Sequence, residues 1–115
     1  MPNHRAPIDG LFHALGDPAR RGMVERLCRG PAAVSELAAP LSMALPSVLQ
    51  HLGVLEAAGL VRSRKVGRVR TFAIQPDAFG MAEQWIAARR LEWERRLDRL
   101  GDYLATLESQ GDENE

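Results

Sequence analysis

Hydrophobic residues recur every three or four positions through the first third of the chain, which is the spacing of one face of a helix. The first such run predicts a short helix over residues 8–15 that ends at Gly16. Asp17 followed by Pro18 is typical of an N-cap and a first helical position, so a second helix is expected to begin there. The pattern extends this second helix to about Arg29.

The next two predicted helices are short and are separated by a few residues. The third is expected near Ser35, and the fourth from Pro46 to Ala58, with Gly59 ending it. The fourth has a single apolar stripe, formed by Val48, Leu52 and Leu55. Two short helices joined by a turn, the second opened by a proline and a polar residue, predict a helix-turn-helix.

The hydrophobic spacing changes after the fourth helix. Leu60 to Lys65 and Val69 to Ile74 are rich in β-branched and basic residues, and Gly67 lies between them, which predicts a β-hairpin. A basic hairpin directly after a helix-turn-helix is the wing of a winged helix. The expected fold is therefore mainly α with a small β-hairpin, a winged helix-turn-helix of order α-α-α-α-β-β-α.

A long final helix is expected from Pro76 to beyond Leu107. Its large apolar residues step by four, three, four and three positions, which is the spacing of a coiled-coil seam: Trp93, Leu97, Leu100, Leu104 and Leu107. Such a seam on a small domain predicts a homodimer that forms through the terminal helices, to which the first helix would contribute Leu11. Packing of the seam on its own domain is the alternative.

Length and composition are those of one folded domain. The 115 residues are 45% hydrophobic and 26% charged, and we expect a single domain over residues 1–108 followed by an acidic, frayed tail over residues 109–115. No apolar run is long enough to cross a membrane, and residues 1–7 lack a signal-peptide core, so a cytoplasmic location is expected. The single cysteine, Cys28, is expected to be a buried, inert thiol.

The formal net charge is zero, but the charges are segregated along the chain. Residues 42–74 contain five basic residues and one acid, whereas residues 108–115 hold four acids and no base. The basic residues are Arg62, Arg64, Lys65, Arg68 and Arg70. A basic segment that coincides with a predicted wing indicates double-stranded DNA as a partner.

Several stretches of the chain resemble the ArsR/SmtB family of bacterial regulators. Residues 15–20 resemble the opening of that family's second helix, residues 45–52 and 54–61 its recognition helix and strand entry, and residues 67–70 its wing. The resemblance implies a homodimeric repressor that binds an inverted-repeat operator at a promoter, often its own, and is released by an inducer. Whether this chain has a small-molecule inducer, and which one, is left open.

The outer face of the fourth helix and the wing are the expected DNA contacts. Gln50 can pair its amide with adenine, Ser47 can bind a base or a phosphate, and Leu49 can meet a thymine methyl. The basic wing residues would neutralise phosphates or enter the minor groove. The predicted DNA-binding set is Pro46, Ser47, Leu49, Gln50, His51, Arg64, Lys65, Arg68 and Arg70. An ordinary solvated surface is the alternative for each of them.

The chain departs from the family in the first turn of its recognition helix. Serine and glutamine often stand there where this chain has Ala44 and Leu45, and a polar residue often stands where it has Leu49. Base readout is therefore expected to depend more on Gln50 and on apolar contacts.

Other chemistry finds little support in the sequence. Residues 33–35 read Ala-Val-Ser where metal-sensing relatives carry a Cys-x-Cys pair, and the final helix has no histidine. The three histidines, His4, His13 and His51, do not cluster, so no metal site and no cofactor are expected. The sequence shows no phosphate-binding glycine loop and no activated nucleophile, so no enzymatic activity is expected. The remaining alternative is a winged helix used as a protein-interaction module, which would expose aromatic residues at this surface.

Overall fold

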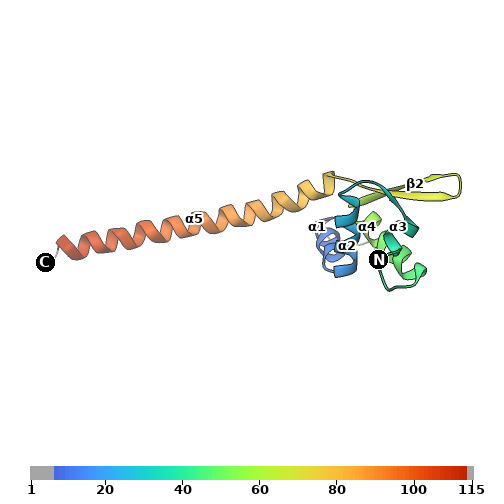
Figure 1. Cartoon of the computed structure of the whole chain (residues 1–115). Helices are drawn as coiled ribbons and strands as arrows, with labels where there is room; N and C mark the ends of the chain where they lie inside the picture. The colour runs from blue at the N-terminus through green and yellow to red at the C-terminus, as the bar shows by residue number, and fades with distance from the viewer. Residues whose placement is uncertain (1–6, 114–115) are drawn as a thin grey trace, which may run out of the picture. The chain divides into compact units, whose positions relative to one another are not determined.

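The computed structural model describes residues 7–113 of the chain, which divides after Ala82 into two compact units. Within residues 7–82 the first unit holds the four helices that the sequence predicts, each at the expected place. They are α1 (Pro7–Leu15), α2 (Pro18–Leu27), α3 (Val34–Ala38) and α4 (Leu45–Ala57). The predicted hairpin follows as β2 (Val61–Val66) and β3 (Val69–Ile74), and Figure 1 shows it extending past the helices. This is the expected winged helix-turn-helix.

Local side-chain chemistry accounts for the ends of these helices. The carboxylate of Asp17 accepts a hydrogen bond of 3.0 Å from the backbone N–H of Arg20 and so caps α2, as predicted. Gly59 ends α4 with a φ of 78°, a left-handed conformation that favours glycine. The second helix ends at Leu27, slightly earlier than expected, and Cys28 is its C-cap.

The position of Cys28 contradicts one prediction. Its side chain is exposed, so the expectation of a buried thiol was wrong. The apolar face of α2 is formed by Met23, Val24 and Leu27, and Cys28, the next residue after Leu27, points away from that face because successive helical residues lie about 100° apart.

The sheet contains one strand that the sequence pattern did not predict. The two-residue β1 (Ala32–Ala33) pairs with β3 in the antiparallel sense, with Ala32 opposite Phe72. The strand order is β1-β3-β2, so β3 is central. In the hairpin, Ser63 lies opposite Phe72 and Lys65 opposite Arg70, and Gly67, with a φ of 62°, forms the turn.

The core of the first unit is apolar and joins all of its helices to the sheet. Its largest fully buried side chains are Leu11, Met23, Leu37, Leu52, Leu55, Leu60, Val48 and Val61. The stripe predicted for α4 is therefore buried as expected. Leu11 is also buried within its own chain, which leaves its side chain no surface to offer a second copy. This placement does not fit the dimer-interface role predicted for Leu11.

The final helix, α5 (Asp77–Glu113), is continuous and begins where the sequence indicates. It extends through residues 109–113, which were expected to be a frayed tail. From residue 83 to residue 111 every residue is exposed. Figure 1 shows α5 as one uninterrupted coil.

Candidate nucleic-acid interface

The recognition helix α4 has one buried and one exposed face. Val48, Leu52 and Leu55 have no solvent exposure, because they pack into the core. The predicted contact residues Pro46, Ser47, Leu49 and Gln50 all lie on the exposed face of the first two turns. These turns carry the side chains that reach base edges when such a helix enters a major groove.

Two large apolar side chains on α4 are exposed to solvent. Leu49 is 45% exposed, and Leu45, one turn earlier, is 52% exposed. Leu45 was not among the predicted DNA contacts, although its spacing of four residues from Leu49 was visible in the sequence. The pair gives the N-terminal half of α4 an apolar outer edge that can meet thymine methyl groups.

A groove of about 340 Å³ connects the recognition helix to the wing. It is lined by Ala33, Val34, Ser35, Leu45, Leu49, Arg68, Val69 and Arg70. Three of the predicted DNA contacts, Leu49, Arg68 and Arg70, are thus brought to one surface from two elements. Among the described residues, none that lines this groove is acidic.

Most of the wing cations have no partner within residues 7–113. Arg64, Lys65 and Arg68 are exposed, and no hydrogen bond or ion pair engages their side chains in this described part. The same is true of Arg62, which the predicted contact set omitted. Alternation along β2 places Arg62 on the same face as Arg64, and both line a second groove of about 630 Å³. Arg62 therefore joins the basic surface of the wing.

Arg70 differs from the other wing cations because it is hydrogen-bonded within the chain. Its Nη1 donates to Oγ of Ser63 at 2.8 Å, and that hydroxyl donates to Oε2 of Glu56 at 2.8 Å. Ser63 is on β2 and Glu56 is near the end of α4. The guanidinium of Arg70 is thus engaged between the wing and the recognition helix.

His51 is also engaged by its neighbours in the chain. Its Nδ1 lies 3.2 Å from Nη1 of Arg20 and 4.0 Å from Oδ2 of Asp17. The same Asp17 carboxylate accepts the backbone N–H of Arg20, which is the main reason why the pKa of Asp17 is lowered from its ordinary value of 3.8. The predicted DNA contact His51 is therefore held by side chains of its own chain, at the junction of α2 and α4.

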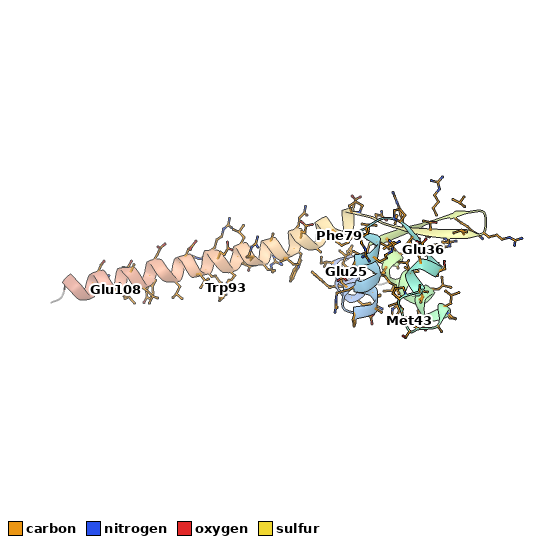
Figure 2. The ribbon with its side chains drawn as sticks, in the orientation of Figure 1. Glu25, Glu36, Met43, Phe79, Trp93 and Glu108 are labelled. Atoms are coloured by element: carbon orange, nitrogen blue, oxygen red, sulfur yellow. The ribbon has the colours of Figure 1, made fainter. Side chains whose placement is uncertain are left out.

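The predicted dimerisation seam is exposed along α5. Trp93 is 60% exposed, and the leucines at positions 97, 100, 104 and 107 are about half exposed. Figure 2 shows the side chains of α5, with Trp93 and Glu108 labelled. Ile86, one heptad before Trp93, extends the same stripe. An exposed apolar stripe of this length marks an association surface.

Other kinds of site are not seen in the described residues. Within residues 7–113 no group of three or more His, Cys, Asp or Glu side chains is placed to hold a metal ion. His4 lies outside the described residues, as do all but the last of residues 1–7, where no signal peptide is expected. No helix in the described part of the chain is long and apolar enough to span a membrane.

Comparison with known proteins gives consistent matches. A helix-turn-helix domain family matches residues 15–64. The HTH-type transcriptional regulator Rv2034 of Mycobacterium tuberculosis is 40% identical over 114 residues, which cover 98% of this chain and 99% of that protein. The solved structure of an ArsR family transcriptional regulator, RHA00566, is 49% identical with a TM-score of 0.75, and the match covers 77% of this chain and 98% of that one.

A third match is a homodimer in solution. The homodimeric winged helix-turn-helix DNA-binding domain of Mb0332 from Mycobacterium bovis is 27% identical, with a TM-score of 0.59. The match covers 75% of this chain and 82% of that one.

Proposed function

The chain belongs to the ArsR family of winged helix-turn-helix transcriptional regulators, and from this premise we propose that it is a homodimeric repressor. One dimer binds an inverted-repeat operator at its own or a neighbouring promoter. A dimer seated there occupies DNA that RNA polymerase must reach, so binding itself lowers transcription. The role is one of binding rather than catalysis, and it is carried out in the cytoplasm, where the chromosome is accessible.

The observation that carries the DNA-binding part of this proposal is the shared surface of α4 and the wing. The groove between them joins the exposed turns of α4 to Arg68 and Arg70 without any acidic lining residue. Of these two arginines, Arg68 has no partner within residues 7–113, and an unpartnered arginine next to a major-groove helix suits a phosphate beside the groove that the helix enters. The absence of exposed aromatic residues from this groove favours nucleic acid over a protein partner.

The dimer part of the proposal rests on α5. The stripe from Ile86 to Leu107 repeats every seven residues and is exposed in the single chain. A second copy of the same helix covers such a stripe by knobs-into-holes packing. Two recognition helices presented by one dimer then match two half-sites of an inverted repeat.

The test is a binding titration of the purified protein with labelled DNA from its own promoter, against unlabelled random DNA and at two salt concentrations. Binding of one dimer per inverted repeat that resists random competitor supports the proposal. A matched DNA with five extra base pairs between the half-sites turns them to opposite faces of the duplex, and it should lose the tight binding. Equal displacement by random DNA on every promoter fragment tested would argue for a protein-interaction module instead.

A further inference from the structure

One cation of the wing is not available to DNA in the same way as the others. Arg70 on β3 donates to the hydroxyl of Ser63 on β2, and Ser63 donates to the carboxylate of Glu56 on α4, with both distances 2.8 Å. These two hydrogen bonds link three elements. They connect the hairpin directly to the C-terminal part of the recognition helix.

The positions of the two charged groups are each unfavourable alone. Glu56 lies in the last turn of α4, where the helix dipole disfavours a negative charge. Arg70 lies directly opposite Lys65 in the antiparallel register, where like charges repel. Arg70 instead reaches diagonally across the ladder to Ser63, and its charge offsets that of Glu56 through the shared hydroxyl. Arg70 and Glu56 therefore compensate each other's unfavourable positions through Ser63.

The outer part of the wing needs such a connection. Strand β1 pairs with β3 at Phe72 and Thr71. From Thr71 toward the tip, the hairpin is therefore a two-stranded ribbon of β2 and β3. Two-stranded ribbons are only marginally ordered in water. Without a fastening, the angle between the tip of the wing and α4 would have to be ordered at the moment of DNA binding, at a cost in affinity.

We propose that Arg70 is a positioning residue that fastens the wing to the recognition helix through Ser63 and Glu56, and is not itself a phosphate contact. The inference rests on the proposed function. It moves Arg70 from the predicted DNA contacts to a positioning role. It gives the same kind of role to Ser63 and Glu56, which do not touch DNA themselves. The fastening holds Arg64, Lys65 and Arg68 at a fixed place relative to α4.

The two roles of Arg70 predict opposite results for Glu56→Ala. If Arg70 were a phosphate contact, removal of the Glu56 carboxylate would free it and reduce repulsion of DNA, so binding would tighten. If Arg70 is a positioning residue, Glu56→Ala weakens operator binding by about two- to ten-fold, as expected for the loss of one hydrogen bond. Glu25→Ala, which removes an equal charge from an exposed position on α2, is the matched control and should not weaken binding.

Ser63 separates connectivity from charge. Ser63→Ala removes the bridging hydroxyl without changing any charge and should weaken operator binding as Glu56→Ala does. Ser63→Thr keeps a hydroxyl and should restore it. Arg70→Ala should lower affinity by a similar factor while the slope of log affinity against log salt stays at the parental value, because no phosphate contact is lost. A slope that falls by about one for Arg70→Ala would overturn the proposal, as would parental affinity in Ser63→Ala and Glu56→Ala.

A second measurement tests the fastening without DNA. Hydrogen exchange of the wing amides in the free protein should be faster in Glu56→Ala and Ser63→Ala than in the parent and in Glu25→Ala. Unchanged exchange would contradict the proposal. If the parent shows no specific DNA binding, the proposed function fails while the exchange result still decides whether the fastening exists.

Discussion

Nη1 of Arg20 lies 3.2 Å from Nδ1 of His51, and the two residues join the start of α2 to the middle of α4. The guanidinium of Arg20 thus faces a ring nitrogen of His51. The same guanidinium donates from Nε to the carbonyl of Ala14 at 2.7 Å and from Nη2 to the carbonyl of His13 at 3.0 Å. Arg20 thus satisfies the end of α1 and holds the recognition helix against it.

The carboxylate beside this pair predicts a pH dependence of stability. The backbone hydrogen bond from Arg20, with the charges of His51 and Arg20, holds the pKa of Asp17 below its ordinary value of 3.8. A lowered pKa in the folded state stabilises the fold above pH 3.8, and this contribution is lost as the pH falls from there through the folded pKa. In urea unfolding from pH 6 to pH 2.5, the difference between the parent and Asp17→Asn should therefore shrink toward the acid end. A difference that is constant with pH would contradict the assignment.

The wing predicts a change in salt dependence. Arg68→Ala should weaken binding to operator and random DNA alike, and the slope of log affinity against log salt should fall by about one, because one phosphate contact is removed. Arg99→Ala on α5 removes the same charge outside the proposed interface and should leave the slope unchanged. Equal slopes for both variants would place the phosphate contacts elsewhere.

Gln50 predicts a change in base preference rather than in overall affinity. Gln50→Ala should relax discrimination at one or two base pairs of each half-site, by about 1–3 kcal/mol if the amide pairs with adenine. Selection from a randomised operator library reads out this change, with Gln84→Ala on α5 as the control. An unaltered preference in the selected sequences would exclude Gln50 from direct readout.

The exposed leucines of α4 predict sensitivity to a single methyl group. Replacing a contacted thymine by deoxyuridine removes only its C5 methyl, and should weaken binding by about four-fold, since a buried methyl contributes about 0.8 kcal/mol. Leu49→Ala should bind thymine and deoxyuridine operators equally. If every deoxyuridine operator binds the parent as tightly as the thymine one, Leu49 faces something other than a thymine.

The seam on α5 predicts the oligomeric state. Leu100→Asp should give monomers in sedimentation and raise the dimer dissociation constant by about 100-fold or more, because a carboxylate would be buried without a partner. Leu91, nine residues earlier, lies on the opposite side of the helix and is also exposed, so Leu91→Asp is the matched control. A dimer that survives Leu100→Asp would move the interface away from this seam.

The features that the sequence predicted are those with local causes. Asp17, Gly59 and Gly67 mark a cap, a helix end and a turn, and each lies where its own backbone chemistry requires it. The strand β1 escaped prediction because two alanines have no strand pattern of their own and pair only with residues some forty positions later, such as Phe72. Periodicity likewise showed that Leu11 faces an apolar surface, but not that this surface is its own core.

The side-chain network was beyond sequence reasoning for a related reason. A basic residue in a wing has the same pattern whether it is free or hydrogen-bonded, and only the antiparallel register brings Arg70 within reach of Ser63. The exposed apolar stripe along α5 was predictable, because a heptad pattern can be recognised in the sequence without knowledge of the tertiary structure.

The strand order β1-β3-β2 leaves one side of β2 without a neighbouring strand in the part of the chain that the structure describes. An open strand edge is a template on which another chain can add a strand, and such additions lead to aggregates. Three of the six residues of β2 are basic, Arg62, Arg64 and Lys65. Two such edges brought together would repel one another, so the charge that suits the wing to a polyanion also protects concentrated protein from edge-to-edge polymerisation.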